Sequence, residues 1–177
     1  MMLIMPCFAS RAGANEVAPK MQGNPKFMQQ AIRLATDNVT SGRGGPFGAV
    51  VVKDGKVIAT GTNQVTASND PTAHAEVTAI RNACNALGTF KLDGCDVYTS
   101  CEPCPMCLAA LYWSRCKTIY YGNDAEDAKK AGFDDSFLYD EVKKPLSERT
   151  IPIVNLLPDE AWESFAEWIK SPFKVDY

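Results

Sequence analysis

The chain has 177 residues, enough for one domain with a sizeable hydrophobic core. Its 46% hydrophobic and 22% charged residues are ordinary for a globular protein, and its net charge of −3 lacks the basic excess expected of a nucleic-acid-binding protein. Apolar runs are too short to span a membrane, so we expect neither a nucleic acid nor a membrane as a partner.

The first 22 residues have the character of an extension. Residues 1–10 are apolar, but they contain no basic residue and are interrupted by Pro6, which argues against a secretory signal peptide. An organellar leader is an alternative, because Arg11 lies among small residues. Glu16 argues against it, since such leaders contain few acidic residues. We therefore expect a loosely held extension over 1–22 and a folded domain over 23–177.

The first part of the domain predicts a helix followed by a β-hairpin. Asn24-Pro25 is a typical helix start, and apolar residues recur at helical spacing up to the glycine-rich stretch 42–46. A β-branched run over 47–53 then meets Asp54-Gly55, a strong signal for a two-residue hairpin, and the chain returns over 57–60.

The middle of the chain predicts alternating helices and strands. We expect a helix from Asp70-Pro71-Thr72 to Gly88, a strand over 95–100, a helix over 104–114 and a strand over 117–121. Because a strand–helix–strand unit with short links forms a right-handed crossover, these two strands should be parallel.

The last third is less regular. We expect a short helix over 124–130, a loop over 132–137, an edge strand within 149–155 and an amphipathic helix from Pro158-Asp159 onward. The apolar face of that helix would carry Trp162, Phe165 and Trp168.

The cysteines favour a reducing compartment. Seven is an odd number that does not suit a regular disulfide framework, whereas metal-bound and free thiols are common in cytosolic enzymes. We therefore expect a cytoplasmic protein.

Two short motifs carry the chemistry: Pro71-Thr72-Ala73-His74-Ala75-Glu76 and Glu102-Pro103-Cys104-Pro105-Met106-Cys107. A catalytic zinc site uses three protein ligands and keeps its fourth position for water, and His74, Cys104 and Cys107 supply such a set. Cys104 and Cys107 lie three residues apart, so one helical turn can present both thiolates. Glu76 is not needed as a ligand and is placed for proton transfer. This combined pattern is typical of zinc-dependent nucleobase deaminases.

A structural zinc site is the alternative. Cys101 precedes Cys104 by three residues, and a fourth protein ligand would close the site and exclude chemistry. Pro103 indicates that Cys104 begins a helix, which leaves Cys101 in the preceding turn, and a structural zinc gives no reason for Glu76. We therefore favour the open, catalytic site.

Both motifs should lie at helix N-termini beyond one edge of the sheet, where the helix dipole favours thiolates. In a regular helix His74 and Glu76 would diverge by about 200°. They can share a site only if it lies past the helix end, near its axis.

With these residues in view, the chain resembles the cytidine-deaminase-like superfamily, and within it the bacterial-type guanine deaminases. The resemblance covers nearly everything after residue 24 and ends on Tyr177. It rests on four segments, 44–50 (GGPFGAV), 68–80 (SNDPTAHAEVTAI), 98–107 (YTSCEPCPMC) and 132–137 (GFDDSF). It implies a three-layer α/β/α cytidine-deaminase-like fold with a mixed five-stranded sheet and helices on both faces.

The resemblance also implies an activity and roles for single residues. The reaction would be hydrolysis of guanine to xanthine and ammonia in purine catabolism or salvage, with one zinc ion per subunit. Zinc-activated water attacks the carbon that carries the amino group, Glu76 moves the proton onto the ring, and Asp135 helps the amino group leave. The substrate would be held by Asn63, Phe47, the backbone at Ala75, and Trp113.

The same family forms homodimers in which the C-terminal segment crosses to the partner, so Tyr177 would close the partner's pocket. Without the resemblance these positions have simpler interpretations: turn residues (Asn63, Asp135), core aromatics (Phe47, Trp113) and a frayed terminus (Tyr177).

Three other functions remain as alternatives. A guanosine or cytidine deaminase needs room for a ribose, which a pocket closed by Tyr177 would not give. A tRNA adenosine deaminase shares the motif but should carry a basic groove for phosphates. A zinc-stabilised module without chemistry would not need Glu76.

Overall fold

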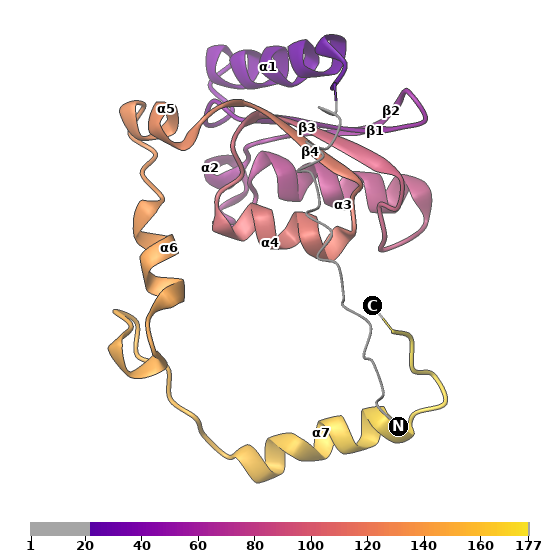
Figure 1. The fold of residues 1–177 in the computed structure, drawn as a ribbon, viewed down its shortest axis with the longest axis vertical. Helices are drawn as coiled ribbons and strands as arrows, with labels where there is room; N and C mark the ends of the chain where they lie inside the picture. Colours follow the sequence, from indigo (N-terminus) through magenta and orange to yellow (C-terminus); the bar gives the residue numbers. More distant parts are fainter. Residues whose placement is uncertain (1–21, 177) are drawn as a thin grey trace, which may run out of the picture.

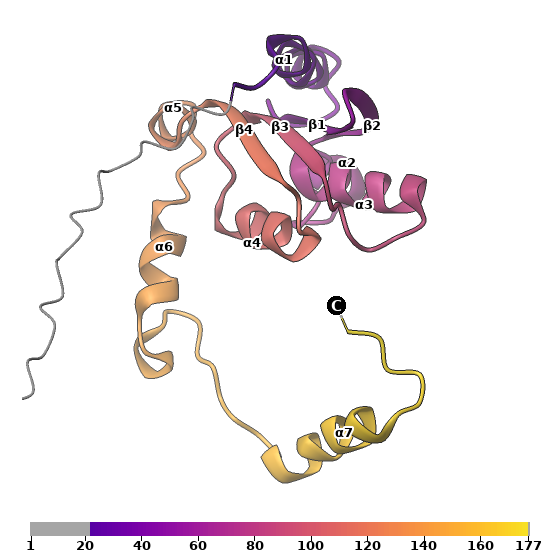
Figure 2. The ribbon, with the colours of Figure 1, turned by 45° about the vertical axis from the view of Figure 1, so that its right-hand side comes forward.

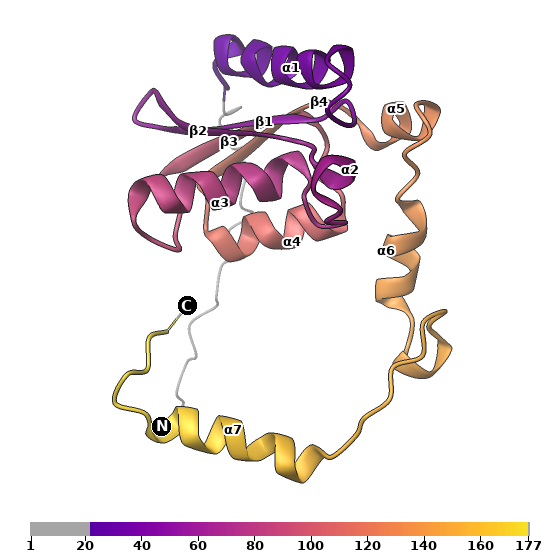
Figure 3. The same ribbon diagram turned by 180° about the vertical axis from the view of Figure 1, so that it is seen from behind.

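The computed structural model describes residues 22–176, so the expected extension over 1–22 lies almost entirely outside the described residues. The body has three layers (Figure 1). Helix α1 covers one face of a mixed sheet, and α3 and α4 lie side by side on the other face (Figure 3). This arrangement confirms the expected α/β/α class.

The elements follow one another in a simple order. They are α1 (Pro25–Thr40), β1 (Gly48–Lys53), β2 (Lys56–Thr62), α2 (Val65–Ser68), α3 (Ala75–Leu87), β3 (Cys95–Cys101), α4 (Pro105–Ser114), β4 (Thr118–Asn123), α5 (Ala125–Lys130), α6 (Ser136–Lys143), a 3₁₀ turn (Leu146–Glu148) and α7 (Pro158–Lys170).

The sheet has the strand order β2-β1-β3-β4. Strand β1 is antiparallel to both β2 and β3, whereas β3 and β4 are parallel, as the crossover predicted. Asp54 and Gly55 both have positive φ angles, 49° and 72°, which is the backbone of the predicted two-residue hairpin.

The sheet is buried on both faces. Val51 and Val97 pack with Leu111 on the side of α3 and α4, while their neighbours Val50 and Tyr98 pack on the side of α1. Successive strand residues point to opposite faces, so one run of apolar residues serves both layers.

Close packing of α3 on β2 depends on Gly61. A Cβ atom at this position would lie 2.3 Å from the Ala75 carbonyl oxygen and 2.4 Å from the Ala79 nitrogen. Only glycine therefore lets the first turn of α3 approach the strand this closely.

Three sequence-based expectations are corrected. The sheet has four strands, because the segment 149–155 forms no strand in the part of the chain that the structure describes, and its apolar residues Ile151 and Val154 are exposed. Helix α3 begins at Ala75, since Asp70 holds Thr72 in a turn by accepting hydrogen bonds from its nitrogen and hydroxyl. The expected loop over 132–137 turns helical at Ser136.

The C-terminal part leaves the body of the domain. After α5 the chain runs through α6 to α7, which lies apart from the sheet and its helices (Figures 1 and 2). The predicted helix from Pro158 is confirmed, but none of its residues is buried. Among the described residues, no helix combines the length and apolar character needed to cross a membrane.

Candidate metal centre and catalytic pocket

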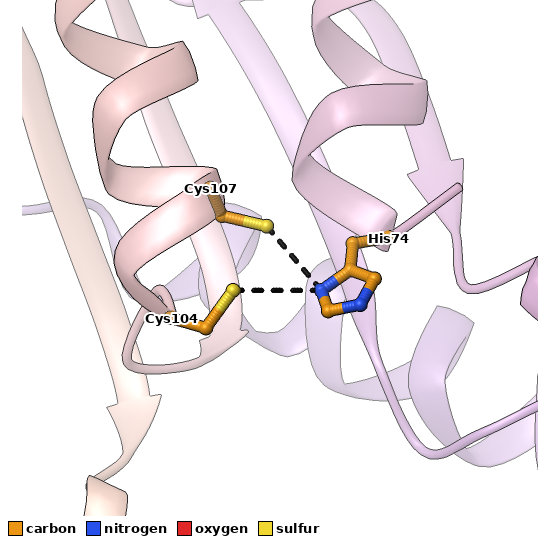
Figure 4. Close-up of side chains that lie close together, drawn as sticks. All are labelled: His74, Cys104 and Cys107. Atoms are coloured by element: carbon orange, nitrogen blue, oxygen red, sulfur yellow. Dashed lines mark hydrogen bonds between the residues drawn. The ribbon is translucent and has the colours of Figure 1, made fainter. Parts of the chain in front are cut away.

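The two motifs meet where α3 and α4 begin. His74 is the N-cap residue of α3 and Cys104 is the N-cap residue of α4, and both have extended backbones. Cys107 lies in the first turn of α4, which Pro105 helps to start. Figure 4 shows the imidazole and the two thiols pointing toward one another from the adjacent helix ends.

His74 and Glu76 would point in different directions if both belonged to one helix, but the backbone of His74 is extended. His74 precedes α3, whereas Glu76 is already in its first turn. The imidazole and the carboxyl group can therefore both border one cavity at the helix end.

The three side chains fit a zinc ion. The Nδ1 atom of His74 lies 3.6 Å from the sulfur of Cys104 and 3.5 Å from that of Cys107, and the ligand atoms all lie within 4.8 Å of one another. Tetrahedral zinc, with Zn–N of about 2.0–2.1 Å and Zn–S of about 2.3 Å, separates nitrogen and sulfur by about 3.6 Å. The donor set thus has the spacing of a zinc site before any ion is placed in it.

The thiols also have suitable electrostatics. Hydrogen bonds from Cys107 and His74 lower the pKa of Cys104 to about 4, so this side chain is a thiolate. The hydrogen bond with Cys104, together with burial, raises the pKa of Cys107. A bound dication would favour deprotonation of the second thiol as well.

Cys101 is not part of this group. Its buried thiol lies 3.9 Å from the Asp124 carbonyl oxygen, and burial raises its pKa to about 11. Within the described residues, the ligand group comprises His74, Cys104 and Cys107 without it. The geometry therefore favours the open set of three protein ligands.

Glu76 is a buried acid beside this group. It is 5% exposed, and burial raises its pKa. The hydroxyl of Thr99 on β3 donates a hydrogen bond of 3.2 Å to its Oε1 atom, which fixes the carboxyl group.

A cavity of about 690 Å³ opens in front of these residues. His74, Glu76 and Cys104 form its floor, and the walls come from three segments, 44–47, 63–66 and 132–135. Small-molecule sites typically have volumes of about 300–1,000 Å³. The predicted residues Asn63, Phe47 and Asp135 all line this cavity.

The 132–135 wall is held by an aromatic contact. The rings of Phe47 and Phe133 meet edge to face, with centroids 4.9 Å apart. The two acids of this wall have different surroundings. Asp134 forms an ion pair with Lys129 at 3.3 Å. Asp135 is partly buried near Cys104, and burial, followed by the charge of Cys104, raises its pKa. Both acids line the cavity, but within the described residues only Asp134 is engaged in an ion pair.

Neither Ala75 nor Trp113 lies on the surface of this cavity. Ala75 is fully buried behind it, and Trp113 is 66% exposed on α4 and lines a different cavity, with Ile80 and Trp168. Tyr177 lies outside the described residues.

Sequence reasoning missed Thr99, Phe133 and Asn38. Thr99 donates a hydrogen bond to Glu76, and buried Asn38 donates one to the carbonyl oxygen of Asn63, a residue that lines the cavity. Neither residue belongs to a motif that the sequence would single out. Phe133 stood in a quoted segment, but only its contact with Phe47 shows what it does.

Comparisons with known proteins agree with this site. Residues 21–123 match the family described as the cytidine and deoxycytidylate deaminase zinc-binding region. The chain is 58% identical to a guanine deaminase of Bacillus subtilis over 146 residues, which cover 79% of this chain and 94% of the relative. A tRNA-specific adenosine deaminase of Agrobacterium fabrum is 51% identical over 84 residues, covering 48% of this chain and 54% of the relative.

Solved structures agree as well. The crystal structure of guanine deaminase from Bacillus subtilis superposes with a TM-score of 0.85 at 54% identity, covering 88% of this chain and 99% of that chain.

The group of His74, Cys104 and Cys107 predicts that zinc binding depends on these residues and not on Cys101. The purified protein should contain one zinc ion per chain, and Cys107→Ser or His74→Ala should lose nearly all of it, because each removes one of three protein ligands. Cys101→Ser is the matched control and should retain zinc. Mass spectrometry of metals measures this, and zinc loss in Cys101→Ser would instead indicate the closed, structural site.

Proposed function

Because the chain belongs to the cytidine and deoxycytidylate deaminase family, we propose that it is a zinc-dependent guanine deaminase that hydrolyses guanine to xanthine and ammonia. The observation that carries this function is the match to nearly the whole length of a guanine deaminase, with the metal group, a buried acid and a small-molecule cavity together at one place.

His74, Cys104 and Cys107 would hold the zinc ion. Bound there, zinc acts as a Lewis acid and lowers the pKa of water to about 7, which makes a nucleophile available at neutral pH. The residues of the chain supply the proton transfers and the orientation of the base.

Glu76 carries the first proton. Its carboxylate accepts a proton from the attacking water and delivers it to the ring nitrogen beside the carbon that carries the amino group. Burial raises the pKa of Glu76, so the acid can keep that proton between the two transfers, and Thr99 fixes the oxygen involved.

Asp135 assists the departure of ammonia. It lines the cavity, and its raised pKa suits proton donation to the leaving amino group. The side chain of Asp134, by contrast, accepts a hydrogen bond from the Ser136 nitrogen and pairs with Lys129, which lowers its pKa.

Asn63 and Phe47 would hold the base. Both line the cavity, with a polar group and an aromatic ring on neighbouring walls. A purine presents hydrogen-bonding edges and flat faces, which suit this pairing. Ala75 would support the base from behind, through the backbone at the start of α3.

A tRNA adenosine deaminase is the less favoured alternative. The Agrobacterium relative of that kind matches under half of this chain, whereas the guanine deaminase match extends over 79% of it. The net charge of −3 also opposes binding to a polyanion.

We further propose a homodimer in which the C-terminal segment crosses to the partner subunit. Helix α7 exposes a row of large apolar residues in the single chain: Trp162, Phe165, Trp168 and Ile169. Such a surface is typical of an interface. Trp113 on α4 would contribute to the assembled dimer, and Tyr177 would close the partner's pocket.

The thiols support a cytoplasmic location. All six cysteines within the described residues are free, which suits a reducing compartment.

A substrate panel tests the function directly. The zinc-loaded protein should release ammonia from guanine and not from guanosine, adenine, cytosine or cytidine, because a pocket closed by Tyr177 would leave no room for a ribose. Ammonia release and ultraviolet absorbance measure this. Activity on guanosine would overturn the base-only pocket, and inactivity on all five would overturn the proposed reaction.

Glu76→Gln separates chemistry from metal binding. We expect the variant to keep one zinc ion per chain and to lose turnover by about 10²–10⁴-fold, because the amide cannot carry the proton. Asp134→Asn is the control, since that acid is engaged with Lys129. Retained turnover in Glu76→Gln would contradict its assignment as acid and base.

Complementation tests the crossing tail. Deleting Tyr177 should raise KM for guanine, because the pocket loses its cover. Co-expression of that chain with a Glu76→Gln chain should restore a low-KM site, since the intact Tyr177 of the inactive chain closes the pocket of the active one. If the tail folded back on its own chain, the mixture would show only the raised KM.

A further inference from the structure

One buried polar side chain has no part in the chemistry described so far. The buried face of α1 consists of Phe27, Ala31, Ala35 and Asn38, and Asn38 is only 1% exposed. Burying an amide costs free energy unless its polar atoms are hydrogen-bonded. An asparagine at the end of an apolar stripe therefore needs a specific reason.

The amide of Asn38 joins two walls of the cavity. Its Nδ2 atom donates to the carbonyl oxygens of Gly45 and Asn63, both at 2.9 Å. Gly44 permits this approach, because a Cβ there would lie 2.4 Å from the Asn63 oxygen and 2.9 Å from the Asn38 nitrogen. One side chain thus fixes the spacing of the 44–47 and 63–66 walls.

The hydrogen bonds around Asn63 leave its side-chain NH₂ group available as a donor. Its main-chain nitrogen donates to the Phe47 oxygen at 3.1 Å, and its Oδ1 atom accepts from the nitrogens of Gly45 and Val65 at 3.4 and 3.3 Å. Within the described residues, the Nδ2 atom of Asn63 has no acceptor, and the residue lines the cavity. The amide is therefore oriented with its NH₂ group available to a ligand.

We propose that Asn38 is a positioning residue for substrate recognition, which acts through the Asn63 main chain and the Gly45 turn. It holds the Asn63 NH₂ group where it donates to an acceptor on the ring of the base. This inference rests on the proposed guanine deaminase activity. Asn38 itself lies behind the wall and does not touch the substrate.

Steady-state kinetics with guanine test the proposal. Asn38→Ala should raise KM about tenfold while kcat stays within about threefold, because it affects the orientation of a binding group and not the proton transfers. Asn63→Ala should raise KM at least as much. In the double variant the two increases in KM should be less than multiplicative, because part of the effect of Asn38 passes through the Asn63 side chain.

The chain offers a matched control. Asn82 on α3 donates its amide to the Thr60 carbonyl oxygen on β2 at 2.9 Å, which is the same kind of side-chain-to-main-chain bond, but on an exposed side chain away from the cavity. Asn82→Ala should leave KM unchanged. If Asn38→Ala does not fold, Asn38→Ser keeps one hydroxyl donor and should raise KM by about threefold.

The outcomes separate the two proposals. An unchanged KM in the Asn38 variants, or KM increases that multiply in the double variant, would overturn the role of Asn38. A loss of active protein without a change in KM would reduce Asn38 to a structural residue. Absence of guanine turnover in the unmodified protein would instead overturn the proposed function.

Discussion

The chemistry depends on two helices beginning side by side at one end of the sheet. The parallel pairing of β3 with β4 sends α4 back across the same face that carries α3, so both N-termini open at the same place. His74 and Cys104 occupy the two N-cap positions, where the chain is still extended and the side chains are free to turn outward. The partial positive charge of both helix ends then favours thiolates and a bound anion. Close packing at Gly61 holds the start of α3 against β2 and so fixes this arrangement.

Around this point the structure separates metal binding from proton transfer. The metal-binding residues come from the helix ends, whereas Glu76, the proposed proton carrier, lies in the first turn of α3, where burial raises its pKa. A buried carboxyl group needs a fixed partner, which Thr99 supplies from the central part of the sheet. The second acid, Asp135, comes from a segment that contacts the sheet layer through Phe133 and Phe47. Helix α3 therefore carries the acid proposed for the attack, and the segment after α5 carries the acid proposed for ammonia release.

How much could be predicted follows from the range of the contacts involved. The ligand group could be predicted because its members fall in two short motifs of metal-binding residues, and the hairpin could be predicted because its backbone requires residues such as Asp54 and Gly55. The strand expected within 149–155 was wrong, since this segment lies between α6 and α7, away from the sheet, and pairs with neither edge strand (Figure 1). The start of α3 was misplaced because Asp70-Pro71 resembles a cap but closes a turn. Asn38 and Thr99 could not be predicted, because neither belongs to a motif of chemically distinctive residues and their roles depend on contacts that only the fold creates.

In the single chain, both the cavity and the apolar face of α7 are open to solvent. The cavity is lined on three sides by the 44–47, 63–66 and 132–135 segments, and the apolar face of α7 has no cover among the described residues. A hydrolytic site for a small base gains from excluding bulk water, and exposed tryptophans gain from burial. If the tail covered the pocket of its own chain, the apolar face of α7 would still have no surface to pack against. The proposed exchange of tails between two chains would satisfy both needs, because the other chain would bury each helix α7 while its terminus covered the neighbouring pocket. On this argument the pocket of the proposed deaminase would be complete only in the proposed dimer.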